Sequence, residues 1–239
     1  MDGYLFIMKK IIRLTETELT RLIKNVLKED ENSLSIKSEI ENKISKLKSV
    51  DEVNSYLSEL NDEYASNSTK LVLIFPGYGQ YSVVASMIYI SGINAQVFTS
   101  INDCIKVINN LASQGKSYEQ IYIGSHGGGK EGLLYSIDEE DNSSVLGGLV
   151  SALSKITIPN KTKIMFSACN AADYTGWYMK QIAELTNSFV YASEGYYDWV
   201  ENESEKGFWL CPPTPKVMGA ITKESNKCRK VGSAPFSWN

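Results

Sequence analysis

The pattern of apolar and polar positions changes near residue 68. Before that point, apolar side chains recur at helical spacing in three stretches. Two of these stretches begin with a capping box, in which Thr15 or Ser49 is followed three residues later by Glu. The segment ASNSTK then has the composition of a linker. We therefore predict a helical N-terminal part, residues 1–67, followed by a second domain, residues 68–239.

From Leu71 onward, short continuous apolar runs alternate with segments of helical periodicity. Such runs are typical of strands that are buried on both faces of a sheet. The predicted strands are LVLIF (71–75), AQVFTS (95–100), QIYIGS (120–125), KIMFSA (163–168) and SFVYAS (188–193). Helices are predicted over Tyr81–Ile90, Ile101–Gly115 and Ala171–Asn187. This alternation predicts an α/β fold, a three-layer sandwich in which a mostly parallel sheet carries helices on both faces.

The composition is that of a globular protein, with 43% hydrophobic and 22% charged residues. The net charge of −4 gives no reason to expect nucleic acid as a partner, because phosphate binding usually requires a basic surface. No apolar run approaches the ~20 residues that cross a bilayer, so no membrane association is expected. The first residues do not form a standard signal peptide, because the lysines follow the short apolar run Leu5–Met8.

Four cysteines are present, at positions 104, 169, 211 and 228. None belongs to a C-x-x-C pair and the chain has one histidine, so we predict no metal site and no cofactor. We interpret the cysteines mostly as reduced thiols. Cys211 and Cys228 remain candidates for a disulfide in an oxidising environment.

The segment IYIGSHGGGKEG, from Ile121 to Gly132, supports two interpretations. Gly124, Gly129 and Lys130 fit most of a phosphate-binding P-loop, but Glu131 stands where that loop needs a Ser or Thr for Mg²⁺. The strand KIMFSA also lacks the terminal Asp that such sites use. We therefore disfavour nucleotide binding.

The second interpretation is a cysteine–histidine dyad. His126 and Cys169 each follow a predicted strand directly, so both would lie at the carboxyl edge of the sheet, where ligands bind in such folds. A thiolate is a strong nucleophile, and an imidazole can take its proton and later protonate the leaving amine. The backbone N–H groups of Gly127 and Cys169 are candidates for an oxyanion hole. The structural alternative is a buried, inert thiol and a histidine that closes a turn.

The segments around these two residues resemble caspase-like (clan CD-type) cysteine peptidases, a group that includes caspases, gingipains, clostripain and legumain. The resemblance covers residues 70–210 and rests on an apolar block ending in His-Gly and a second ending in Ala-Cys. The closer likeness is to bacterial members with S-H-G-x-x-G, C-N-x-A and V-x-A-S motifs. It implies that Cys169 is the nucleophile and His126 the general base, without a metal. Inactive copies of this fold also occur.

In such peptidases the P1 pocket is usually lined by residues that follow the nucleophile strand and the next strand. Here that second region offers Glu194 and Asp198, which would favour a P1 Arg or Lys. The alternative is an ordinary solvated acidic loop. The acidic segment IDEEDNSS, between the two motif strands, is an expected exposed loop where self-processing could occur.

The pattern of the N-terminal segment MKKIIRLTETELTRLIKNVLKED predicts a basic amphipathic helix on an acidic protein. It resembles leaders that target cargo into the capsids of tailed bacteriophages and are trimmed by a prohead protease after a Leu/Ile-x-Glu site. Leu27-Lys28-Glu29 matches that site, which implies processing after Glu29. The alternative is a helix that packs on the domain.

The sequence thus predicts a hydrolase, a cysteine endopeptidase that acts on a peptide or protein substrate. The competing hypothesis is a catalytically inactive caspase-like virion or interaction protein, packaged through its N-terminal helix. The expected location is the bacterial cytoplasm or the interior of a phage virion, with the capsid or its protease as a possible partner.

Overall fold

The structure is a computed structural model that describes residues 38–64, 68–75, 84–85, 88, 94–128, 132–135, 143–172, 177–198, 203–213 and 228–232. The chain separates into two compact units, Met1–Ile40 and Glu41–Asn239, and the elements below belong to the second. The predicted helix at Thr15 and the processing position after Glu29 lie outside the described residues.

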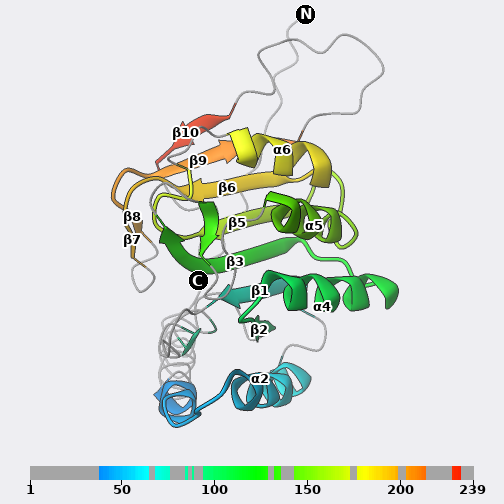
Figure 1. Cartoon of the computed structure of the whole chain (residues 1–239), viewed down its shortest axis with the longest axis vertical. Helices are drawn as coiled ribbons and strands as arrows, with labels where there is room; N and C mark the ends of the chain where they lie inside the picture. The colour runs from blue at the N-terminus through cyan, green and yellow to red at the C-terminus, as the bar shows by residue number, and fades with distance from the viewer. Residues whose placement is uncertain are drawn as a thin grey trace, which may run out of the picture. The chain divides into compact units, whose positions relative to one another are not determined.

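Five parallel strands form the centre of the sheet, and all five were predicted (Figure 1). They are β1 (Lys70–Phe75), β2 (Ala95–Val97), β3 (Gln120–Gly128), β5 (Lys163–Ser167) and β6 (Phe189–Ser193). The spatial order is β6-β5-β3-β1-β2. β2 ends earlier than predicted because Ser100 caps the next helix, where its side chain accepts a hydrogen bond from the N–H of Asp103.

Antiparallel strands extend this sheet beyond the prediction. They are β4 (Gly132–Tyr135), which pairs with β3, and β9 (Phe208–Cys211) and β10 (Arg229–Val231), which continue the sheet from β6. A separate hairpin joins β7 (Tyr197–Asp198) and β8 (Glu203–Ser204). None of these strands was predicted from the sequence. The fold class is confirmed as α/β, with a mostly parallel mixed sheet and helices packed on it.

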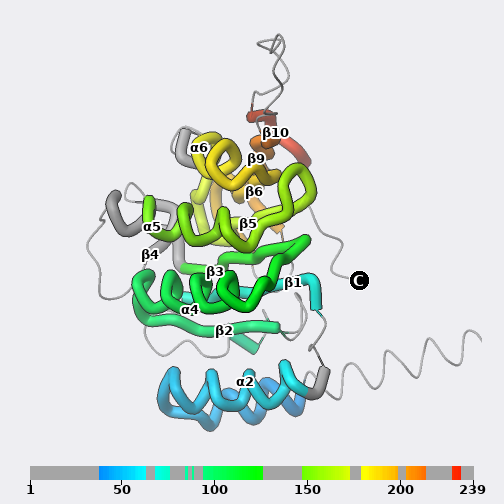
Figure 2. The backbone as a smooth tube through the Cα atoms, turned by 90° about the vertical axis from the view of Figure 1, so that its right-hand side faces the viewer, coloured from blue at the N-terminus to red at the C-terminus, as the bar shows by residue number. Residues whose placement is uncertain are grey.

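Three helices lie on one face of the sheet: α4 (Ile101–Ser113), α5 (Ser143–Leu153) and α6 (Trp177–Thr186) (Figures 1 and 2). Their buried side chains share one cluster with alternate residues of the strands. Because the parallel register aligns Leu71, Ile121, Ile164 and Val190, one row of apolar side chains crosses the sheet beneath these helices. The residues on the opposite face, such as Val72 and Met165, are also buried, as predicted for strands covered on both faces.

A further helix, α2 (Val50–Tyr64), runs alongside β2. Its predicted capping box is present, because the Ser49 hydroxyl accepts a hydrogen bond from the N–H of Glu52 at 3.2 Å. The Glu52 carboxylate in turn accepts from the N–H of Lys48 at 2.7 Å, one residue before the cap. Val53 and Leu57, at helical spacing, are fully buried.

The sequence did not predict α5, because two adjacent glycines interrupt its helical pattern. Its first residues, Ser143 and Ser144, also end the segment that was expected to be an exposed loop, and the rest of that segment lies outside the described residues. Gly148 explains one of the two glycines. A Cβ atom there would lie 3.1 Å from Cδ1 of Ile105, so glycine allows α5 to approach α4 closely.

Gly147 has no such neighbour, since a Cβ atom there would meet nothing within 4 Å. Gly147→Ala is therefore expected to raise the free energy of unfolding by about 0.5–1 kcal/mol, through the lower entropy of the unfolded chain. Gly148→Ala lowers the entropy of the unfolded chain by the same amount, but its new methyl group must displace the side chain of Ile105. Its increase in the free energy of unfolding is therefore smaller or absent. Urea denaturation of both variants checks this, and equal gains would contradict the close packing of α5 on α4.

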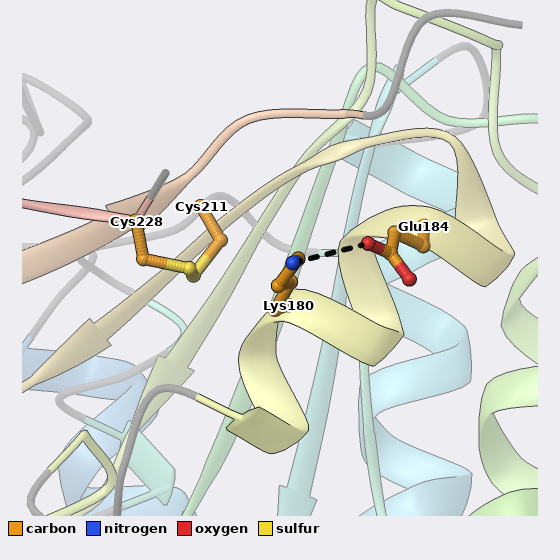
Figure 3. Close-up of a disulfide and its surroundings, with 4 residues drawn as sticks. All are labelled: Lys180, Glu184, Cys211 and Cys228. Carbon is orange, nitrogen blue, oxygen red and sulfur yellow. Dashed lines mark ion pairs between the residues drawn. A yellow bond between two sulfur atoms is a disulfide. The ribbon is translucent and has the colours of Figure 1, made fainter. Parts of the chain in front are cut away.

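The interpretation of the cysteines as reduced thiols was wrong for two of them. Cys211 and Cys228 form a disulfide with a Cα–Cα distance of 4.1 Å, between β9 and the residue that precedes β10 (Figure 3). The bond lies beside α6, where Lys180 and Glu184 form an ion pair at 3.8 Å. Cys104 and Cys169 are free.

Candidate active site at the carboxyl edge of β3 and β5

The register of β3 and β5 brings the two predicted dyad positions to the same level of the sheet. These strands are parallel neighbours, and their last aligned pair is Gly124 and Ser167. His126 and Cys169 each follow that pair by two residues. Since neighbouring strands lie ~4.8 Å apart, the two backbones meet at one edge. The side chain of His126 lies outside what the structure describes.

The backbone after His126 forms a hairpin. His126 pairs with Tyr135, Gly128 pairs with Gly132, and the ladder is irregular between them, at Gly127. Bulges of this kind are frequent beside active sites, where they reorient backbone groups. This strand–hairpin arrangement also differs from a P-loop, in which the glycines lead directly into a helix.

Cys169 lies in the turn that follows β5 and is half-buried with a free thiol. Its Sγ lies 4.0 Å from the carbonyl oxygen of Tyr197. Among the described residues, the N–H of Cys169 has no hydrogen-bond acceptor. An N–H group without an acceptor is what an oxyanion donor requires, and the roles of Cys169 as nucleophile and as donor stay predictions.

The turn that holds Cys169 is fixed by the segment after β6. Asn170 adopts φ 59°, in the left-handed region, and its N–H donates to the carbonyl oxygen of Gly195 at 2.7 Å. The Ser193 hydroxyl donates to the carbonyl oxygen of Ala168, and the N–H of Ala172 donates to that of Ser193 at 2.9 Å. These contacts explain why the helix predicted from Ala171 begins later, at Trp177 in α6.

Two buried tyrosines anchor β7 against β3, on the same strand face as Ser167. The hydroxyl groups of Tyr122 and Tyr197 lie 3.0 Å apart and form a hydrogen bond. Burial raises the pKa of both phenols, so they stay neutral at ordinary pH. The Ser167 hydroxyl is also buried, and it has no hydrogen-bond partner among the described residues.

Sequence reasoning did not single out this tyrosine pair. Tyr122 alternates with Gly124 and His126 along β3, so the two-residue period of a strand could have placed it on the same face. Tyr197 gave no comparable signal, because the short strand β7 contains two residues and has no periodicity to detect.

The two predicted substrate-binding carboxylates come from the segment that follows β6. The Glu194 carboxylate lies 2.6 Å from Nζ of Lys230 and accepts a hydrogen bond from Nε1 of Trp209 at 3.0 Å. The contact with Lys230 holds the pKa of Glu194 below its ordinary value. Asp198 lies in β7, where its backbone pairs with Glu203. A role for either carboxylate in a P1 pocket stays a prediction.

The fold and the site together define an α/β protein with a free thiol at the carboxyl edge of a mostly parallel sheet. No known protein family, curated protein or solved structure matches this chain. Within the described ranges, no helix is long and apolar enough to cross a membrane. The same ranges contain no cluster of three or more His, Cys, Asp or Glu side chains that could hold a metal ion.

Proposed function

We propose that this chain is a caspase-like cysteine endopeptidase in which Cys169 is the nucleophile and His126 the general base. The observation that carries the proposal is the register of β3 and β5, in which both residues stand two positions beyond the last aligned pair. The free, half-buried state of Cys169 supports it, because a nucleophile must be reachable by substrate.

In the proposed reaction, the imidazole of His126 takes the proton of the Cys169 thiol, and the thiolate attacks the carbonyl carbon of the scissile peptide bond. The oxyanion that forms accepts hydrogen bonds from the N–H groups of Gly127 and Cys169. As the C–N bond breaks, the imidazolium returns the proton to the leaving amine. Water, deprotonated by His126, then hydrolyses the thioester and restores the thiol.

One observation favours the alternative, a non-catalytic interaction protein of the same fold. The Cys169 sulfur lies 4.0 Å from the carbonyl oxygen of Tyr197, so it already has a polar contact within the chain. In that case function would reside in the N-terminal segment, for which we propose the role of a capsid-targeting leader in a phage virion.

Labelling with peptidyl acyloxymethyl ketones separates the two functions. The probe carries P1 Arg, and matched probes carry P1 Asp and P1 Asn. A single adduct that mass spectrometry maps to Cys169, absent in Cys169→Ala, is the result expected of the peptidase. If none of the three probes forms an adduct, the peptidase proposal is contradicted and the non-catalytic interaction protein is favoured.

The preference among these probes depends on Lys230, which neutralises Glu194 in the free protein. If Glu194 receives a basic P1 side chain, Lys230→Met should increase the labelling rate with the P1 Arg probe. The expected increase is at most about fivefold, because an ion pair this exposed is worth ~1 kcal/mol or less. The P1 Asn probe is the control. An equal increase in labelling rate with both probes would show that Glu194 does not bind the P1 side chain.

A further inference from the structure

The outer edge of β2 needs hydrogen-bond partners, because β2 is the last strand at one end of the sheet. On its inner side, the N–H of Val72 donates to the carbonyl oxygen of Asn94 at 2.9 Å, and the N–H of Phe98 donates to that of Ile74 at 2.8 Å. Successive residues of a strand point their backbone groups in opposite directions. Ala95 and Val97 therefore direct one N–H and one carbonyl each away from the sheet.

Two asparagines of α2 satisfy all four of these groups. The Asn54 amide donates to the carbonyl oxygen of Val97 at 2.9 Å and accepts from its N–H at 2.9 Å. The Asn61 amide makes the same two contacts with Ala95, at 3.4 Å and 3.3 Å. The two asparagines stand two helical turns apart, and α2 runs antiparallel to β2 along its edge (Figure 2).

An asparagine side chain carries the same donor and acceptor as a peptide group. Each pair of contacts therefore reproduces the exchange of two hydrogen bonds between opposite residues of an antiparallel ladder. We propose that the outer edge of β2 is a strand-addition surface that α2 occupies within the chain. The partner that fits this surface when α2 leaves it is the same edge of a second copy of this chain.

The arrangement of the outward groups argues for a second copy as the partner. Antiparallel pairing of two β2 strands about Gln96 places Ala95 of each chain opposite Val97 of the other. This pairing forms four backbone hydrogen bonds, the same number that the two asparagines supply. It closes a two-fold dimer, so no further copies can add at that edge.

The apolar residues of α2 decide which arrangement prevails in the native chain. Val53 and Leu57 are fully buried and Leu60 nearly so, and displacement of α2 would expose them. In the described part of the chain, these side chains lie outside the core cluster that α4, α5 and α6 share with the sheet. Displacement of α2 would therefore remove no member of that cluster, but it would expose these side chains, and because this exposure costs free energy the native chain is expected not to dimerise through β2.

The first test removes the asparagine amides with Asn54→Ala/Asn61→Ala in the full chain. Ser55→Ala/Ser58→Ala is the matched control, because both serines are exposed on the same helix and every change to alanine raises helix propensity. Sedimentation equilibrium should show the asparagine variant dimerising with a Kd at least about tenfold below that of the native chain. The serine variant should sediment like the native chain.

The second test reads the register. Symmetric pairing about Gln96 places the two copies of this residue opposite each other, ~4.5 Å apart at Cα. Gln96→Cys in the asparagine variant should form a 96–96 disulfide between chains under mild oxidation, mapped by mass spectrometry. The same substitution in the native background should not. If the double variant does not fold by circular dichroism, the single variants Asn54→Ala and Asn61→Ala replace it, each with a smaller decrease in Kd.

Three results would overturn the proposal. The first is a folded asparagine variant that stays as monomeric as the native chain. The second is a dimer that forms without the 96–96 crosslink. The third is a native chain that already forms this crosslink to the same extent. None of these readouts involves Cys169 or His126. The test of the β2 edge as a strand-addition surface is therefore independent of peptidase activity.

Discussion

His126→Ala is expected to slow the hydrolysis of a peptide substrate by about 10²–10⁴-fold near pH 7, and the labelling of Cys169 by up to about 30-fold, because about 3% of an ordinary thiol is ionised at that pH. The reason is that the imidazole supplies the route by which the thiol loses its proton and the leaving amine gains one. Without it, labelling depends on the small fraction of thiol that ionises in water. The difference from the native protein should therefore narrow as the pH rises, because hydroxide can then ionise the thiol.

The measurement is the second-order rate constant for alkylation by iodoacetamide, followed across the pH range for native protein, His126→Ala and Cys169→Ala. Cys104 is an internal control, because burial raises its pKa and its side chain is fully buried in α4, so it should not react in the folded chain. A His126→Ala variant that reacts at the native rate at every pH would show that the two residues do not act together.

The sequence was sufficient to predict that positions 126 and 169 lie at one edge of the sheet, because the strands that precede them have strong apolar patterns. β3 and β5 were both predicted, and a parallel sheet brings the carboxyl ends of its strands to one edge. What the sequence could not supply is the register. That Gly124 faces Ser167, and not a residue one step away, depends on how the apolar rows of both strands pack beneath α4 and α5.

Elements stabilised by tertiary contacts were harder to predict. α5 was missed because the local cost of Gly147 and Gly148 argues against a helix, whereas the packing of Gly148 near Ile105 explains one glycine. The edge contacts of Asn54 and Asn61 were missed for a related reason. In a sequence, two asparagines on a helix look like solvent-facing positions, and their partners lie 43 and 34 residues away.

The cysteine pair shows the same limit. Sequence alone could name Cys211 and Cys228 as candidates but could not choose between a disulfide and two thiols, because neither β9 nor β10 has a pattern long enough to predict. In the structure, the antiparallel register pairs Leu210 with Arg229, so the two cysteines stand opposite each other at the next position. The disulfide thus follows from strand pairing that only the folded sheet reveals.

Cys228→Ser is expected to lower the free energy of unfolding by about 3 kcal/mol, since the disulfide closes a loop with a sequence separation of 17 and restricts the unfolded chain. The measurement is urea denaturation with and without reductant. Reductant should lower the native protein to the stability of the variant and leave the variant unchanged. A native protein that is indifferent to reductant would show that the bond contributes nothing to stability.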